Sequence, residues 1–181
     1  GPTAVIAKID IKHAFRLCPV HPSVWHLLGF RWDGSYYYDL RLPFGSRSSP
    51  FIFNSFADLV TWIIRNVACI LYVIHYLDDF FLCQNNTEDC QRVRDTILSL
   101  FNDLGIPVAN EKLEGPATTI TFLGIEIDSV ANEVRLPADK FKKLVALLTF
   151  WRGRKKCTKQ ELLSLIYHHI DLNAAAQAEI Q

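Results

Sequence analysis

The sequence predicts an α+β fold with a mostly antiparallel sheet backed by helices. Strand-like and helix-like segments alternate unevenly along the 181 residues, and two pairs of strand-like segments form hairpin patterns. Half of the residues are hydrophobic, with twelve Phe, six Tyr and four Trp, which is enough for a core and excludes global disorder. The length indicates one domain, or one domain plus a fragment of a second.

The N-terminal half predicts a strand, a hairpin, a loop and a helix, in that order. Residues 4–11 are β-branched and almost continuously hydrophobic, as in a buried strand. Residues 27–42 hold two strand-like runs around an Asp-Gly pair, which is a strong hairpin signal. A loop rich in Gly, Ser and Pro follows over 42–50. Ser49 is the expected N-cap and Pro50 the first residue of a helix over 50–66 with helical apolar spacing.

The C-terminal half predicts a second hairpin, a helix, two short strands and a further helix. The second hairpin spans 69–83 and carries an Asp-Asp pair at its apex. A helix is expected over 87–105, with Thr87 as its N-cap, acidic residues in its first turn and a glycine at its C-terminal end. The remaining strands and helix are expected, in order, at 119–127, at 133–136 and from residue 137 onward.

Composition limits the classes of function and the compartment. The formal net charge is zero, so any site for a polyanion has to come from a local patch. The five cysteines are odd in number and show no C-x-x-C spacing, which argues against a disulfide framework or zinc site and favours a reducing compartment, either cytoplasm or nucleus. No apolar run reaches membrane-spanning length, so no membrane partner is expected. The opening Gly-Pro and the lack of Met indicate a piece of a longer reading frame.

Three aspartates are the first candidates for chemistry. Asp78 and Asp79 are adjacent and would repel each other unless a positive charge lies nearby. If the strand that ends near Asp10 belongs to the same sheet as the second hairpin, all three carboxylates converge. Carboxylate oxygens suit Mg²⁺, and a pair of such ions can activate an attacking oxygen and stabilise a leaving one. An ordinary turn beside a polar strand end fits the spacing equally well.

Five segments occur in a fixed order: KIDIKHAF, LPFGSRSSPFIFN, YLDDFFL, LGIPVANEKLEG and FLGIEID. Together they resemble the motif series of reverse transcriptases, the RNA-directed DNA polymerases, over roughly residues 4–166, and most closely that of DIRS-type retrotransposons. The resemblance implies a polymerase palm over 1–136, with a remnant of the fingers–palm region and the fingers largely missing. It also implies a helical, basic start of an incomplete thumb over 137–166 and a divergent tail over 167–181.

The resemblance assigns a two-metal site to these carboxylates. Asp10 and Asp78 would bind both metals, Asp79 would be the third carboxylate, and the backbone carbonyl of Ile11 would complete the site. The implied cofactor is a pair of Mg²⁺ ions, for which Mn²⁺ can substitute. Lys112 matches the lysine that acts as general acid toward the leaving pyrophosphate, although a surface lysine in a loop would look the same.

The resemblance also implies residues that contact an incoming dNTP. Phe15 matches the steric gate that rejects a 2′-hydroxyl, with core packing as the alternative. Phe44 and Gly45 match the loop that lies over the nucleotide, and some relatives carry glutamine at the position of Phe44. Arg47 would meet template backbone, or it is an ordinary exposed arginine.

Contacts with an RNA or DNA primer–template are expected at two places in the second half of the palm. Tyr76 would contact the primer terminus, and it would share a face with Asp78 if their strand ran on. Phe122, Leu123 and Gly124 match the primer-grip hairpin, which can also be a buried edge hairpin. His75 is expected to be a packed strand histidine rather than a ligand.

A basic stretch lies where the resemblance places the thumb. Phosphate contacts from this stretch would hold primer–template in a salt-sensitive, sequence-independent way, while a solvated helix face is the alternative. Thr158 and Glu161 have the spacing of a capping box. The basic side chains are those of Lys140, Lys142, Lys143, Arg152, Arg154, Lys155, Lys156 and Lys159.

Two functions from different classes follow from the resemblance. The first is a polymerase that adds dNTPs to a primer 3′-hydroxyl on an RNA or DNA template. The second is a catalytically silent palm-derived module, host-adopted or truncated, that acts by binding protein or nucleic acid. Only nine residues precede Asp10, with Lys8 the one charged residue among them, so a basic clamp on the triphosphate is lacking. Missing fingers would expose apolar surface around 62–72, which favours self-association or a protein partner.

Overall fold

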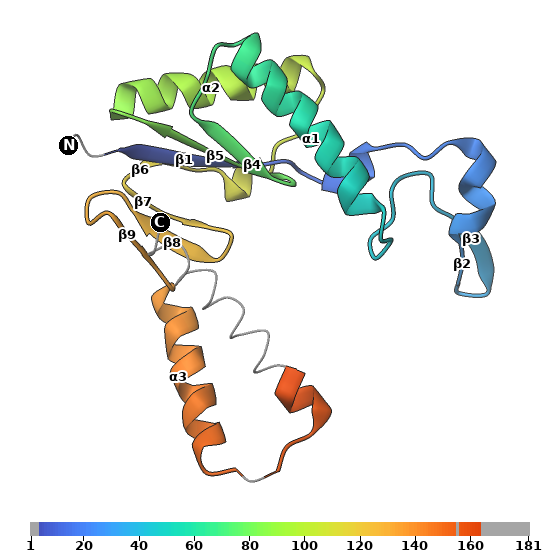
Figure 1. Ribbon diagram of the computed structural model, residues 1–181. Helices are drawn as coiled ribbons and strands as arrows, with labels where there is room; N and C mark the ends of the chain where they lie inside the picture. Colours follow the sequence, from blue (N-terminus) through green and yellow to red (C-terminus); the bar gives the residue numbers. More distant parts are fainter. Residues whose placement is uncertain (1–3, 155, 164–181) are drawn as a thin grey trace.

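The computed structural model describes residues 4–154 and 156–163, and the predicted α+β class is confirmed (Figure 1). Its central element is a four-stranded sheet with strand order β4-β5-β1-β6, in which every pairing is antiparallel. The strands are β1 Val5–Asp10, β4 Val73–Tyr76, β5 Asp79–Gln84 and β6 Glu114–Ala117. Helices α1 Ser49–Asn66 and α2 Thr87–Asp103 lie together on one face of this sheet.

The two faces of β1 explain how the sheet is packed. Because side chains alternate along a strand, Ala7 and Ile9 point to the helical face, where both are fully buried in the main core. Phe80 of β5 joins them there and packs edge-on against Phe101 of α2, with ring centroids 5.3 Å apart. Lys8 and Asp10 therefore belong to the opposite face, which helices do not cover.

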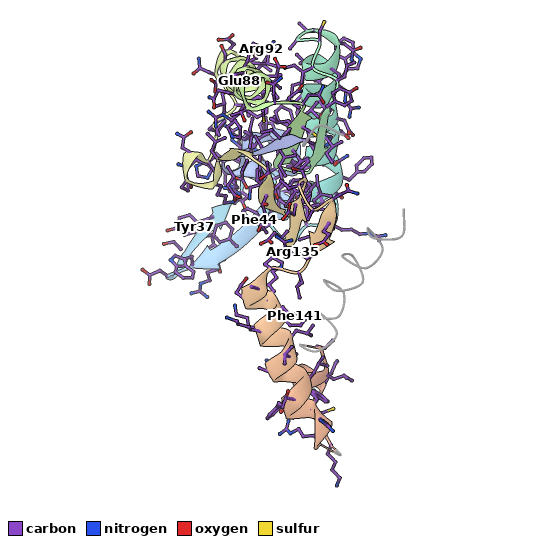
Figure 2. The ribbon with its side chains drawn as sticks, turned by 90° about the vertical axis from the view of Figure 1, so that its left-hand side faces the viewer. Tyr37, Phe44, Glu88, Arg92, Arg135 and Phe141 are labelled. Carbon is purple, nitrogen blue, oxygen red and sulfur yellow. The ribbon has the colours of Figure 1, made fainter. Side chains whose placement is uncertain are left out.

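A second small sheet covers part of that opposite face. It has the order β7-β8-β9, with strands β7 Thr119–Phe122, β8 Ile125–Asp128 and β9 Glu133–Arg135, and it lies below the main sheet in Figure 1. Helix α3 Ala138–Arg152 follows and extends away from the body of the molecule. Leu144 is the one buried residue of α3, and Phe141 stands out from the helix in Figure 2.

A third, two-stranded sheet projects beside the main body (Figure 1). The hairpin of β2 Gly29–Trp32 and β3 Ser35–Tyr38 turns at the predicted Asp33-Gly34 pair, where both residues have positive φ. Every strand residue of this hairpin is exposed, including Trp32 and Tyr37. Two 3₁₀ helices, Ala14–Leu17 and Pro22–Leu28, connect it to β1.

The structure shifts two predicted helix caps by one residue. Ser49 lies inside α1, where its hydroxyl donates to the Pro43 carbonyl at 2.8 Å instead of capping the helix. Asn86 is the N-cap of α2 and accepts from the Asp89 N–H at 2.8 Å, so Thr87 is the first helical residue. Strand β6 was not predicted, because its Glu-Gly-Pro-Ala sequence has the composition of a loop.

The predicted capping box and the packed histidine are both confirmed. Thr158 Oγ1 accepts from the Glu161 N–H at 3.2 Å, and Glu161 Oε2 accepts from the Thr158 N–H at 2.8 Å. His75 stacks on Phe80, and its Nδ1 lies 2.7 Å from Thr61 Oγ1. Lys155 and the predicted tail over 167–181 lie outside the described residues.

Two further features concern the borders of the fold. Strand β4 is one of the two edge strands of the main sheet, and Arg65 of α1 donates to its Val73 carbonyl at 2.5 Å. No helix within residues 4–154 and 156–163 is long and apolar enough to cross a membrane.

Candidate active site

The three aspartates meet where β1 ends and β5 begins. Asp10 is the last residue of β1 and stands directly opposite Asp79, the first residue of β5. Asp78 lies in the two-residue turn between β4 and β5, and its carbonyl accepts from the Ile11 N–H at 2.9 Å. The preceding turn residue, Leu77, has a positive φ of 52°. Two distant parts of the chain are thus joined at one corner of the sheet.

The position of Tyr76 corrects one expectation. The β4 strand ends at Tyr76 and turns at once, so Asp78 does not follow it on the same strand, because the hairpin reverses within two residues. Tyr76 pairs instead with Asp79, which in turn pairs with Asp10. Directly paired residues share a face of a sheet, so these three side chains form one row on the face opposite the helices. The Tyr76 side chain is exposed.

Excess negative charge dominates the electrostatics of this corner. Asp10 is only 4 % exposed. Burial raises the pKa of Asp79 to about 6, and repulsion from Asp10 and Asp78 and a hydrogen bond with Asp10 add to the increase, while Lys8 opposes it. Burial also raises the pKa of Asp78, together with repulsion from Asp10. A cation at this corner would relieve the repulsion among the carboxylates.

Lys112 already supplies one positive charge to Asp10. Its Nζ donates to Asp10 Oδ2 at 2.9 Å, and this bond and the attraction of Asp10 raise the pKa of Lys112. The backbone holds the lysine in reach, because the Ala109 N–H donates to the Asp10 carbonyl at 2.9 Å and a short 3₁₀ helix, Asn110–Lys112, follows. With 58 % of its side chain exposed, Lys112 is also accessible from solvent.

The donor chemistry fits Mg²⁺, although the side chains do not form a ready cage. Asp10 and Asp79 offer hard oxygen donors from adjacent strands, and Asp78 lies in the adjoining turn. Within the described parts of the chain, no group of three or more His, Cys, Asp or Glu side chains is arranged to hold a metal ion. Asp10 and Asp79 share a hydrogen bond instead, and Asp10 is paired with Lys112.

The predicted nucleotide-binding residues lie together on one side of this corner. The Phe15 ring is 5.5 Å from that of Phe44 and 5.6 Å from that of Phe53 in the core. Phe15 is therefore both a packing residue and a neighbour of the loop, while Phe44 is 70 % exposed (Figure 2). Gly45 has a φ of +83°, and Arg47 in the same loop is exposed.

The predicted primer-grip segment is the β7–β8 hairpin. Phe122 is buried and packs against Phe81 of β5 with ring centroids 4.9 Å apart. Leu123 and Gly124 form the turn, both with positive φ, and Leu123 is exposed. The end of the hairpin next to the turn is thus fixed to the main sheet through Phe122, while Leu123 of the turn is exposed.

Sequence reasoning missed one residue of this region. Lys8 is half-buried beside the carboxylates and binds Glu114 of β6 and the Thr121 carbonyl of β7. The available signal was a single charged residue inside an otherwise hydrophobic strand. Lys156, one of the two thumb lysines expected to meet primer–template phosphates, is exposed and lies on the segment that follows α3.

Comparison with known proteins decides the family. The sequence model of the family described as "Reverse transcriptase (RNA-dependent DNA polymerase)" matches residues 2–127. The chain belongs to the reverse transcriptase family. Among curated relatives of this reverse transcriptase domain is Protein P of duck hepatitis B virus, strain China, which is 28% identical over 139 residues. The corresponding protein of strain Germany/DHBV-3 is 30% identical over 140 residues.

These alignments cover 76% of this reverse transcriptase domain and 17% of each viral protein, so the chain spans about a sixth of the length of those relatives. Solved structures show the same fold. A foamy viral protease-reverse transcriptase in complex with an RNA/DNA hybrid superposes with a TM-score of 0.73 at 21% identity, covering 91% of this chain and 20% of that one. A foamy viral protease-reverse transcriptase in complex with dsDNA superposes with a TM-score of 0.72 at 22% identity, covering 91% and 32%.

Proposed function

We propose that this reverse transcriptase domain catalyses nucleotidyl transfer, adding dNTPs to the 3′-hydroxyl of a primer on an RNA or DNA template. The observation that carries the proposal is the corner at which Asp10 and Asp79 stand opposite each other, with Asp78 in the adjoining turn. A corner of crowded carboxylates in a chain of this family is suited to divalent cations. The same row ends in the exposed Tyr76, to which we assign contact with the primer terminus.

In the proposed mechanism Asp10, Asp78 and Asp79 hold two Mg²⁺ ions, or Mn²⁺ in their place, with the Ile11 carbonyl as a further ligand. Bound Mg²⁺ would lower the pKa of the primer hydroxyl and stabilise charge on the leaving pyrophosphate. Lys112 would deliver a proton to that pyrophosphate, because its ammonium group is accessible to solvent and lies against Asp10. The repulsion between unoccupied carboxylates favours uptake of the cations.

The neighbouring residues are assigned to substrate. Phe15 would lie against the sugar of the dNTP, with Phe44 and Gly45 above the nucleotide and Arg47 near template backbone. Phe122, Leu123 and Gly124 would hold the primer end. The solved neighbours in complex with an RNA/DNA hybrid and with dsDNA support a primer–template ligand for this fold.

We assign the palm to residues 1–136 and the start of the thumb to 137–166. The support is that α3 begins at Ala138 and leaves the body of the molecule there (Figure 1). Lys155 and Lys156 would then meet phosphates of the primer–template. The residues of the sequence motifs favour an origin in DIRS-type retrotransposons. All five cysteines are free thiols, which is compatible with an intracellular, reducing location.

Primer extension on an RNA template tests the function. The wild-type chain should extend a primer in Mg²⁺ or Mn²⁺, and Asp78→Asn, Asp79→Asn and Asp10→Asn should each lower the rate by at least about 100-fold. Asp95→Asn is a matched control, because Asp95 is an exposed carboxylate of α2 whose partners are Gln91 and Arg94. Extension that survives all three substitutions would contradict the two-metal assignment.

A second function is favoured by one observation. Trp62, Val67, Leu71 and Tyr72 form an exposed apolar surface along the end of α1 and the segment that follows it. A catalytically silent binding module would use such a surface for a protein partner or for self-association. This second function would be supported if the wild-type chain does not extend a primer and if Trp62→Ser weakens its binding to a protein partner or to itself.

A further inference from the structure

Lys8 forms a bridge between three strands beside the carboxylates. Its Nζ donates to Glu114 Oε1 of β6 at 2.6 Å and to the Thr121 carbonyl of β7 at 3.2 Å. Only 15 % of its side chain is exposed. A half-buried ammonium with one carboxylate and one carbonyl acceptor holds both in a defined geometry. Lys8 thereby joins β1 to the second small sheet.

The bridge lies on the same face as the candidate active site. Lys8 precedes Asp10 by two positions on β1, so both side chains point away from the helices. Its acceptor, Thr121, directly precedes Phe122, the last residue of β7 before the turn of the β7–β8 hairpin. Strand β1 therefore carries both Asp10, a candidate catalytic carboxylate, and Lys8, which attaches the β7–β8 hairpin.

An aromatic contact accompanies the bridge but cannot replace it. Phe81 is the cross-strand partner of Lys8, and its ring packs against that of Phe122 at 4.9 Å. Ring packing constrains position less strictly than a hydrogen bond does. Another polar link to this region, from the Ser129 hydroxyl to the Ala4 carbonyl, lies at the far end of the hairpin. The hydrogen bond to the Thr121 carbonyl depends on distance and angle, so it fixes the hairpin along β1.

We propose that Lys8 is a positioning residue, which sets the distance between the β7–β8 hairpin and Asp10 so that a primer end held by the hairpin reaches the carboxylates. The proposal rests on the function proposed above. Without the ammonium group, the hairpin would still bind primer, but its 3′-hydroxyl would no longer be aligned. A misplacement of about 1 Å is sufficient to lower a rate by about 100-fold.

Substitution of Lys8 by methionine tests the proposal, because methionine keeps most of the side-chain length and removes the charge. We expect kcat for primer extension to fall about 10- to 100-fold, while KM for dNTP and Kd for primer–template stay within about threefold. A primer with 2-aminopurine at its 3′ end should change its fluorescence in the Lys8→Met complex. Unchanged kcat and unchanged fluorescence in a folded variant would overturn the proposal.

Arg135→Met is the matched control for a merely structural effect. Arg135 binds Glu126 at 2.6 Å and Asp128 at 2.9 Å and lies 3.6 Å from Glu133, so its ion pairs are with β8 and β9 of the same small sheet. The control should lower Tm without changing kcat or the primer fluorescence. An equal loss of kcat in Arg135→Met would overturn the proposal, because general loosening of the sheet would then explain both variants.

Failure of the proposed function gives a different result. If the wild-type chain binds primer–template without extending it, the catalytic function is contradicted. The role of Lys8 is still tested in that case, by comparing the 2-aminopurine fluorescence of the wild-type and Lys8→Met complexes. A Glu114→Gln variant keeps an acceptor for the ammonium and should retain most of the wild-type fluorescence. Fluorescence altered in Glu114→Gln but not in Lys8→Met would overturn the role assigned to Lys8.

Discussion

Asp10 and Asp79 face each other as a directly paired couple on adjacent antiparallel strands, at the point where both strands reach the same edge. Like charges in such a position destabilise a sheet. Burial raises the pKa of Asp79 to about 6, and repulsion from Asp10 and from a third carboxylate, Asp78, adds to the increase, as does a hydrogen bond with Asp10. The arrangement therefore lowers stability locally when these carboxylates are charged, and a cation bound at this corner would relieve their repulsion.

The pH dependence of stability should report this pair. Because the pKa of Asp79 is raised to about 6 in the folded state, the native protein binds more protons than the unfolded chain between pH 4 and pH 6. Without divalent cations, the free energy of unfolding should fall as pH rises through that window. Asp79 is only half-buried, so we expect a loss of about 1–2 kcal/mol rather than the roughly 3 kcal/mol of the full shift.

Urea midpoints measured across pH 4 to 7 would check this expectation. Asp79→Asn should be less sensitive to pH in that window, and added Mg²⁺ should raise the stability of the wild type at pH 7 by mass action on the folded state. Stability of the metal-free wild type that rises from pH 4 to pH 6 would contradict the charge balance described for this corner.

Two variants of Lys112 separate proton donation from charge. Lys112→Met removes both, whereas Lys112→Arg keeps the charge beside Asp10 but cannot release a proton near neutral pH. If Lys112 is the general acid, both variants should lower the single-turnover rate by about 100-fold or more. Wild-type rates in Lys112→Arg would limit the role of the lysine to electrostatics. Stability should change by less than about 1 kcal/mol, since the ion pair is largely exposed on the lysine side.

Phe15→Val should weaken discrimination against ribonucleotides. A smaller side chain leaves room for a 2′-hydroxyl, and we expect the ratio of kcat/KM for dNTP to that for rNTP to fall about 10- to 100-fold. The control is Phe56→Val, because Phe56 packs on Phe53 at 5.7 Å in the same aromatic cluster, whereas Phe15 is the member that contacts Phe44. An equal change of the ratio in the control would remove the gate assignment.

Gly115→Ala should destabilise the junction of β1 and β6. A Cβ at this position would overlap the Ile6 carbonyl oxygen and lie 2.8 Å from Ala7 Cα, and φ is +84°. We expect a loss of about 3 kcal/mol or more in urea unfolding. Gly34→Ala, with a φ of +77° and open space around it, should cost only about 1–2 kcal/mol. Equal losses of unfolding free energy in the two variants would show that the positive φ, and not the overlap with Ile6 and Ala7, causes the destabilisation at Gly115.

The periodic elements could be predicted from the sequence, because a buried strand and a hairpin each have a local pattern. The convergence of the aspartates was expected only if the strand that ends at Asp10 shares a sheet with the second hairpin, and local patterns do not show whether it does. The register of the hairpin could not be predicted. The tight turn places Asp79 rather than Asp78 opposite Asp10, and it depends on a positive φ at Leu77, a residue type that gives no turn signal. Strand β6 was missed for a related reason, since its pairing with β1 comes from tertiary contact and not from its own propensity.

Lys8 and Lys112 show the same limit for charged residues. Each is a single lysine in the sequence, and its acceptor lies about a hundred positions away in the chain, at Glu114 and at Asp10. Local spacing contains no information about such pairs. Lys112 was assigned from the resemblance of its motif, whereas the contacts of Lys8 became visible only with the docking of β6 and β7 against β1.

The contact between Arg65 and the Val73 carbonyl has a consequence for the solubility of the domain. An outer strand with exposed Leu71, Tyr72 and Ile74 beside or within it offers a template onto which a strand of another molecule could add. The guanidinium already occupies a carbonyl of that strand and places a permanent positive charge beside it. Extension of the sheet from one molecule to the next would have to displace an arginine, which protects a concentrated solution of this domain against ordered aggregation.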